Sequence, residues 1–226
     1  MLEYPKIETL YNRDEKTHRV IPGQLRLAEF GNIRRWQITE KVDGTNIRIG
    51  LSPDGNVSFN GRTDNAQLPA PLVSYLQTTF TAEKLGAVFP AAHQGEVLLF
   101  GEGYGAKIQK GGIYRRDMAF RLFDVLIGPW WLEPDAIADI ASKLNILTVP
   151  CLGEIDALPR TSDDLKTLLG NDGNSTVALQ DQGSGGRAEG IVARTAPLLL
   201  TRRGQRLLWA RPGSSRRAIR PPRGPG

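Results

Sequence analysis

Short runs of alternating apolar and polar residues recur along the chain, and they predict β-strands. Two further runs are almost wholly apolar and have the length of strands in the middle of a sheet. An Asp-Gly pair at Asp43-Gly44 and a Pro-Asp-Gly sequence at residues 53–55 are turn signals, so we expect hairpins at both places. The predicted strands cover residues 36–41, 45–51, 56–63, 95–102, 118–128, 189–195 and 206–210.

Apolar residues at helical spacing predict helices between these strands. We expect one or two helices within residues 70–89 and a clear helix over residues 133–145. A shorter helix is expected over residues 162–171, with Ser162 as its N-cap. Residues 171–187 are rich in Gly, Ser, Asn and Asp, which indicates a polar, mobile loop.

The order of these elements predicts the fold class. Strands come first, helices are interspersed and strands come last, an order typical of an α+β fold with mostly antiparallel sheets flanked by helices. We find no internal repeat and no internal boundary, so we expect one domain over residues 1–210 and a tail over residues 211–226.

The positive charge belongs to the end of the chain. The formal net charge is +5, but eight arginines lie from Arg202 onward, and without them the chain has 21 basic and 24 acidic residues. A basic tail favours phosphate backbones without sequence preference. Its Arg, Pro and Gly composition cannot bury a core, so we expect the tail to be disordered.

The sequence also argues against several classes of protein. No apolar run approaches the length of a membrane span, and residues 1–5 do not resemble a signal peptide, so we expect no membrane association and a cytoplasmic location. The single cysteine, Cys151, excludes an internal disulfide, and its strand-like surroundings predict a buried, inert thiol. The oligomeric state is left open.

Lys41 is the candidate for covalent chemistry. It ends a predicted strand and is followed at once by Val-Asp-Gly-Thr-Asn. A free lysine has a pKa near 10.4, so roughly one in 10³ is a nucleophile at neutral pH, and a reactive lysine needs a special environment. For an isolated Lys-x-Asp-Gly, an exposed lysine in a hairpin is the simpler explanation, but further motifs follow downstream.

Five short motifs in a fixed order resemble the covalent nucleotidyltransferases, which include ATP-dependent RNA and DNA ligases and mRNA capping enzymes. EKVDGTNIRI is similar to their nucleotidyl-lysine motif, and its flanking residues are closest to phage-type and RNA-editing RNA ligases. FNGRTDN, LLFGEGYG, RLFDV and AEGIVAR follow in the family's order. The resemblance covers most of the chain, from Glu40 to Arg194, and implies a ligase adenylation-domain (nucleotidyltransferase) fold.

The resemblance implies ATP as cofactor, with Lys41 attacking its α-phosphate to form a lysyl-adenylate. Glu40 would then lie by the adenine edge, and Phe123 would stack on the purine. Glu102 would accept a hydrogen bond from a ribose hydroxyl. Asp124 would hold the residues that contact the nucleotide in position, without contacting the nucleotide itself.

The remaining site residues concern phosphate, metal and nucleic acid. Asn46 and Arg62 would hold phosphate or the acceptor end, and Arg62 and Glu189 would join Lys41 as catalytic residues. Glu189 would position Mg²⁺ or Mn²⁺, because a carboxylate with waters is the usual arrangement for Mg²⁺. The implied partners are RNA ends, including those of a nicked duplex. A glycine-rich loop from Gly103 carries Lys107, Lys110, Arg115 and Arg116. This composition is typical of a phosphate-contacting loop or of a plain surface loop.

The sequence departs from the family near its end. The family carries two lysines, one residue apart, on the last strand of the catalytic domain, but no lysine occurs after Lys166. Arg206 and Arg211 are the nearest cations, and Pro212 would interrupt a strand ladder. Self-adenylation is therefore expected to be impaired. Alternatively, the end of the chain is translated out of frame. Residues 212–219 can be encoded by codons that, read in a shifted frame, give Gly-Lys-Leu-Lys. The coding DNA distinguishes the two explanations.

Several functions remain open. The leading hypothesis is the catalytic core of an ATP-dependent RNA ligase that joins 5′-phosphate and 3′-hydroxyl ends. About sixteen residues follow Ala210, so we expect no separate oligonucleotide-binding barrel. A DNA ligase is favoured by Asp43 but opposed by the size of the chain and by Asn46, and a capping guanylyltransferase is opposed by Glu40. A non-catalytic nucleotide-binding or nucleic-acid-binding module is favoured by the missing lysine pair.

Overall fold

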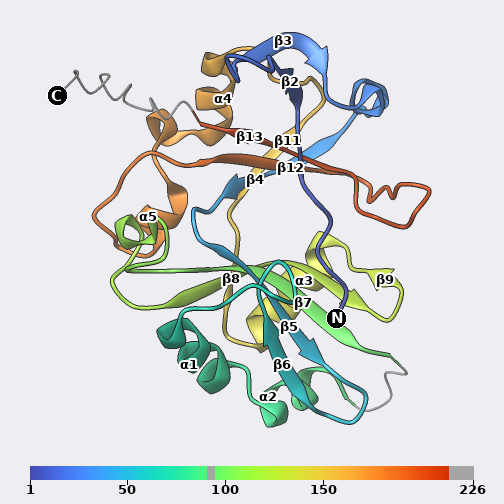
Figure 1. Ribbon diagram of the computed structural model, residues 1–226, viewed down its shortest axis with the longest axis vertical. Helices are drawn as coiled ribbons and strands as arrows, with labels where there is room; N and C mark the ends of the chain where they lie inside the picture. Colours follow the sequence, from blue (N-terminus) through green and yellow to red (C-terminus); the bar gives the residue numbers. More distant parts are fainter. Residues whose placement is uncertain (91–94, 214–226) are drawn as a thin grey trace, which may run out of the picture.

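The strands pair into two mostly antiparallel sheets, which lie one above the other in Figure 1. The structure is a computed structural model that describes residues 1–90 and 95–213. The upper sheet has the order β1 (Glu8–Thr9), β13 (Leu208–Pro212), β12 (Gly190–Thr195), β4 (Trp36–Lys41) and β11 (Cys151–Ile155). The lower sheet has the order β10 (Leu147–Thr148), β8 (Ala119–Ile127), β7 (Val97–Tyr104), β5 (Thr45–Leu51) and β6 (Val57–Asn60), with β9 (Trp130–Trp131) on β8.

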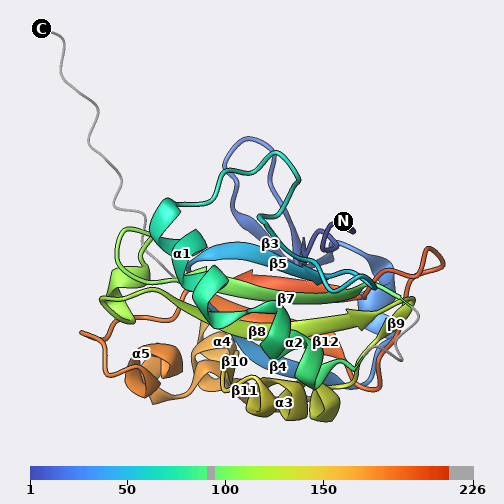
Figure 2. The ribbon, with the colours of Figure 1, turned by 90° about the horizontal axis from the view of Figure 1, so that it is seen from below.

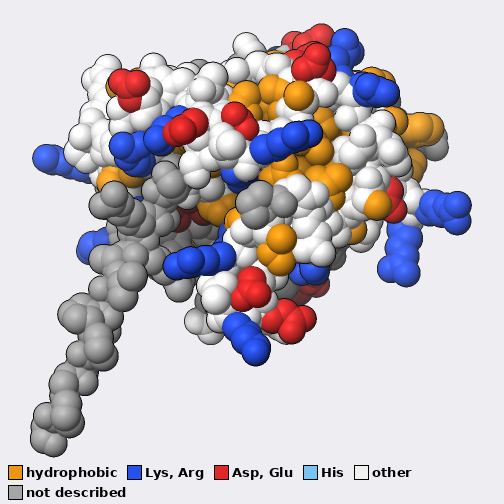
Figure 3. Space-filling view, turned by 90° about the horizontal axis from the view of Figure 1, so that it is seen from above, with side chains coloured by type: hydrophobic (Ala, Val, Ile, Leu, Met, Phe, Trp, Pro, Cys, Tyr) orange, Lys and Arg blue, Asp and Glu red, His pale blue; other side chains and the backbone are white. Residues whose placement is uncertain are grey.

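The predicted strands and the α+β class are confirmed, because each predicted strand corresponds to one of β4, β5, β6, β7, β8, β12 and β13. A separate hairpin of β2 (Tyr11–Arg13) and β3 (Val20–Leu25) projects at the upper end of the molecule. Lys and Arg side chains are spread over the surface of this end, beside hydrophobic side chains (Figure 3).

Three helices cover the outer face of the lower sheet (Figures 1 and 2): α1 (Ala70–Thr79), α2 (Ala82–Val88) and α3 (Pro134–Lys143). Their apolar residues, among them Leu72, Leu85 and Ile137, pack against Ile49 and Leu122 of the strands. The opposite face of the lower sheet contributes a second apolar cluster, which also includes Leu208 of the upper sheet. The helices cover one face of the lower sheet and the upper sheet covers part of the other. Both faces are therefore buried, which explains why β7 and β8 are apolar at nearly every position.

The hairpin predicted at Asp43-Gly44 is wrong. β4 pairs with β11 and β12, whereas β5 pairs with β6 and β7, so residues 42–44 cross from one sheet to the other. Gly44 passes so close to β7 that a Cβ atom there would lie 2.4 Å from the Gly103 carbonyl oxygen. The Asp-Gly pair therefore serves a crossover between sheets, which places Lys41 at their junction. The second predicted hairpin, β5–β6, is confirmed.

Three local predictions also need correction. The N-cap of α4 (Ser162–Leu169) is Thr161, whose hydroxyl accepts from the Asp164 backbone N–H in a capping box, and not Ser162. The predicted loop after α4 contains a short helix, α5 (Thr176–Gln180). Cys151 is exposed, because it begins β11 at the edge of the upper sheet.

Short 3-10 helices occupy residues Ala28–Asn32, Gly111–Ile113 and Asn171–Gly173. Every helix in residues 1–90 and 95–213 is too short or too polar to cross a lipid bilayer. Of the predicted tail, Arg211 and Pro212 belong to β13, where Pro212 is the last residue, and residues 214–226 lie outside the described part of the chain.

Candidate active site

A cavity of about 340 Å³ lies between the two sheets. Its walls come from β4, β12 and β13 of the upper sheet and from β5, β7 and β8 of the lower one, and residues 4–7 close one side. Six of the predicted site residues line it: Glu40, Lys41, Asn46, Arg62, Glu102 and Phe123. The tertiary structure thus brings together residues from four separate motifs of the sequence.

Lys41 is the last residue of β4, and its Nζ lies 2.5 Å from Oε1 of Glu189. The register of the upper sheet causes this contact, because Lys41 is paired with Gly190, the residue after Glu189. Burial raises the pKa of the Glu189 carboxyl, while the nearby Lys41 ammonium opposes that rise. A carboxylate that binds a proton more readily, in contact with an amine, is suited to remove the proton that the amine must lose.

Glu102 and Asn46 face each other across β7 and β5, where they are paired in the ladder. Burial raises the pKa of Glu102 to about 8, although Lys41 lowers it. Two oxygens at this site, Asn46 Oδ1 and Glu189 Oε2, are buried without a hydrogen-bond partner among the described residues. Such acceptors match the water ligands of a hydrated cation, so the residues present fit Mg²⁺ or Mn²⁺ held through water.

The described residues contain no group of three or more His, Cys, Asp and Glu side chains that could by itself hold a metal ion. Direct coordination by a protein cage is therefore not built into this part of the chain. Glu189 does not line the inter-sheet cavity, but it lines a second cleft next to Lys41. The contact between Glu189 and Lys41 connects this cleft to the inter-sheet cavity.

We expect the Glu102 carboxyl to make stability fall as the pH rises from about 4.5 to about 8. The unfolded chain releases this proton near pH 4.5, whereas the folded protein retains it to about pH 8. The unfolded state therefore binds fewer protons in this window, which lowers the free energy of unfolding by about 5 kcal/mol in total, roughly 3 kcal/mol of it above pH 5.5. Urea unfolding at pH 5.5 and 8.5 measures the difference in the free energy of unfolding.

Glu102→Gln should remove much of this difference and be relatively more stable at pH 8.5. Glu96→Gln, at an exposed position just before the same strand, is the matched control. An equal loss of stability between the two pH values in wild type and Glu102→Gln would contradict the expectation.

Phe123 and Asp124 are neighbours on β8 with different surroundings. Phe123 lines the cavity and packs edge-on against Tyr4, with ring centroids 5.0 Å apart. Asp124 is buried and accepts a hydrogen bond from the Tyr4 hydroxyl, and its Oδ1 lies 2.9 Å from Arg206 and 3.5 Å from Arg194. Asp124 does not line the cavity, but its partners Tyr4 and Arg194 do, and its supporting role stays a prediction.

Glu40 has a structural partner that the sequence did not predict. Its buried carboxylate accepts hydrogen bonds from the Ser175 hydroxyl and from the backbone N–H groups of Thr176 and Val177. A carboxylate at a helix N-terminus satisfies free N–H groups and interacts favourably with the helix dipole. Glu40 therefore anchors α5 beside the cavity.

The two arginines nearest to the expected place of the missing lysines, Arg206 and Arg211, do not line the cavity. β13 lines it with Leu208 and Ala210, while Arg206 pairs with Asp124 and Arg211 donates to the carbonyl oxygens of Pro159 and Arg160. Cations that do line the cavity are Lys6, Lys41, Arg62 and Arg194.

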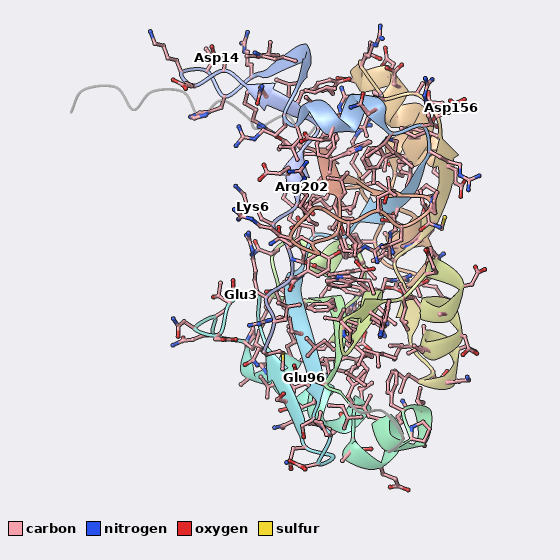
Figure 4. All side chains as sticks on the ribbon, turned by 90° about the vertical axis from the view of Figure 1, so that its right-hand side faces the viewer. Glu3, Lys6, Asp14, Glu96, Asp156 and Arg202 are labelled. Atoms are coloured by element: carbon pink, nitrogen blue, oxygen red, sulfur yellow. The ribbon has the colours of Figure 1, made fainter. Side chains whose placement is uncertain are left out.

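Sequence reasoning missed Lys6. Its side chain is 68% exposed and lines the cavity from the N-terminal segment, at the margin of the molecule in Figure 4. It lies there because β1, two residues later, pairs in parallel with β13. A two-residue strand has no recognisable pattern, so the sequence carries no signal for this contact.

A model of the RNA ligase family matches residues 34–208. A search of curated protein sequences found no match. Among solved structures, a lysine-to-alanine mutant of the Naegleria gruberi RNA ligase with ATP and Mn is 17% identical, with a TM-score of 0.61 over 92% of this chain and 61% of that one. A lysine-to-methionine mutant of that ligase with AMP and Mn is also 17% identical, with a TM-score of 0.59 over 82% and 51%.

This chain thus spans about half to three fifths of the length of these structures, and at this identity the likeness shows the fold. The family match covers more than half of the chain and includes every predicted site residue. This chain belongs to the RNA ligase family.

Proposed function

We propose that the chain is the catalytic core of an ATP-dependent RNA ligase that joins 5′-phosphate and 3′-hydroxyl ends through a lysyl-adenylate at Lys41. The observation that carries the proposal is the position of Lys41, at the junction of two sheets, in contact with Glu189 and on the same cavity as Phe123. Family membership and the ATP and Mn of the Naegleria gruberi structures support it.

In the first step, Glu189 takes the proton from the Lys41 ammonium, which frees the nitrogen lone pair. The nitrogen attacks the α-phosphorus of ATP, a P–N bond forms, and the bond to pyrophosphate breaks. Pyrophosphate leaves with the electron pair of that bond, and the proton lost from nitrogen passes to solvent. Phe123 would hold the purine within the cavity, and Asn46 and Arg62 would hold phosphate oxygens.

In the next steps, an oxygen of the RNA 5′-phosphate attacks the AMP phosphorus and the P–N bond breaks, so that the lysine regains its proton. The oxygen of the RNA 3′-hydroxyl then attacks the 5′-phosphorus and gives its proton to solvent, while the phosphoanhydride bond breaks and AMP leaves with its electron pair. Mg²⁺ or Mn²⁺, held through water by Glu189 with Asn46 and Glu102 nearby, would neutralise charge on the phosphates.

Lys6 is proposed to supply a cation for the ATP phosphates, because the positions of β13 that line the cavity are uncharged. We expect Lys6→Ala to weaken ATP binding about tenfold, the size of one partly exposed charge-assisted hydrogen bond. Calorimetric titration of ATP measures this, with the exposed Lys16→Ala as control. Equal ATP affinities of the two variants would show that Lys6 does not contribute to ATP binding.

The second candidate function is a nucleotide-binding module that cannot adenylate its own lysine. Leu208 and Ala210 favour it, because they line the cavity from the last strand, where the family carries its lysine pair.

A labelling experiment separates the two. The protein is incubated with Mg²⁺ and α-labelled ATP or GTP and run on a denaturing gel, and nicked RNA and nicked DNA are tested for sealing. Label from ATP with sealing of RNA supports the ligase. Folded protein that takes no label, yet joins a pre-adenylated RNA end, places the defect in the first step. Folded protein that does neither supports the binding module.

A further inference from the structure

A second cleft, of about 260 Å³, adjoins the Lys41–Glu189 pair through Glu189. We call it the α4 cleft. Its walls come from α4, from the glycine-rich loop before β8 and from residues 186–189 before β12. Asp43 and Glu189 lie on its wall, so the cleft comes within one side-chain contact of Lys41, which lines the proposed ATP cavity.

Three cations from three separate elements line the α4 cleft: Lys110, Lys166 and Arg187. Lys110 forms no ion pair with the described residues and lies close enough to Glu189 to lower its pKa. Among residues 1–90 and 95–213, Lys166 pairs only with Asp163, which is 87% exposed, and Arg187 donates to the Asp172 carbonyl oxygen at 3.3 Å. Their charge is therefore available to a ligand.

The cleft also has an apolar wall, made of Ile113, Leu165, Leu169 and Ala188. Beyond it, Lys166 and Arg187 line a second, open depression of about 510 Å³ together with residues 170–172. The two cations thus lie along a path that begins at Glu189 and continues over the surface. Spaced cations beside apolar surface suit a polynucleotide, which presents a phosphate at every sugar.

From this arrangement we propose that the α4 cleft binds the sugar-phosphate backbone of the RNA strand next to the end that is joined. Lys110 would contact a phosphate near Glu189, and Lys166 and Arg187 would contact phosphates farther from the end. This inference rests on the proposed function, because a ligase must bring an RNA end to the AMP that Lys41 carries. It also gives a role to Lys110 of the glycine-rich loop.

The test measures RNA binding without chemistry. A 5′-phosphorylated, fluorescent RNA is titrated with protein that carries Lys41→Ala, without ATP, at several salt concentrations, and anisotropy is recorded. Lys110→Ala, Lys166→Ala and Arg187→Ala should each weaken binding about threefold to tenfold and reduce the magnitude of the salt slope by about one. Lys143→Ala, which removes an exposed cation on α3, is the matched control and should change neither quantity.

Two outcomes would overturn the inference. One is that the three variants, shown by circular dichroism to be folded, bind RNA as the Lys143→Ala control does. The other is that the triple variant loses affinity for ATP as strongly as for RNA, because the cleft would then hold the nucleotide phosphates. Wild-type protein that takes label from ATP, but whose RNA binding does not depend on the three cations, would reject this inference and keep the ligase. Cleft-dependent RNA binding, when the wild-type protein neither takes label nor joins a pre-adenylated RNA end, would keep the cleft as an RNA-binding site and reject the ligase.

Discussion

Lys41→Ala is expected to abolish transfer of label from α-labelled ATP to the protein. The bond that retains AMP is formed by the Lys41 nitrogen, and among the described residues that line the cavity no other lysine contacts a carboxylate as closely as the 2.5 Å of Lys41 and Glu189. The measurement is the amount of label on the protein band after a denaturing gel, with Mg²⁺ present.

Glu189→Gln tests the role of the carboxylate separately. It keeps the shape of the side chain but removes the proton acceptor, so labelling should slow by roughly 10²-fold or more. Lys143→Ala, a distant exposed lysine, should label as wild type does. Label that persists in Lys41→Ala would show that another residue carries the AMP.

The second large effect is expected at a buried ion pair. The side chains of Arg121 and Asp181 are 1% and 2% exposed, and Nη2 and Oδ1 of the pair lie 2.8 Å apart. Asp181 also accepts from the Tyr104 hydroxyl, and Arg121 donates to Tyr104, Gln180 and the Thr148 carbonyl oxygen. Asp181→Ala leaves the guanidinium charge buried without its counter-ion, which should lower the free energy of unfolding by about 3–5 kcal/mol.

Urea unfolding at constant pH measures this loss. The urea concentration at the midpoint should fall, while the dependence of the unfolding free energy on urea concentration stays unchanged. Asp139→Ala is the control, because it breaks a pair whose side chains are 57% and 58% exposed, and it should change stability by less than about 0.5 kcal/mol. Equal losses in the two variants would mean that the buried pair contributes nothing beyond an exposed one.

The Arg121–Asp181 pair also matters for the site, because Asp181 follows α5 and ties it to the lower sheet, while Glu40 ties its other end to β4. We therefore expect a partly destabilised Asp181 variant to lose ATP affinity as well. The short helix that the sequence did not predict thus connects the two walls of the cavity.

Elements with a local pattern could be predicted from the sequence. Alternation within β4, β5 and β6, apolar runs in β7 and β8, and helical spacing in α1, α2 and α3 depend on which side of each element is buried. Short motifs in a fixed order also predicted the family, because the residues that react or bind must be of particular types.

The sequence by itself determined the strands, the long helices, the α+β class and Lys41 with its neighbouring motifs. Only the tertiary structure decided that β4 and β5 belong to different sheets, that Glu40 holds α5 and that Lys6 reaches the cavity beside β13. The physical reason is that periodicity reports the burial of one element, whereas strand partners and side-chain contacts depend on residues far away along the chain.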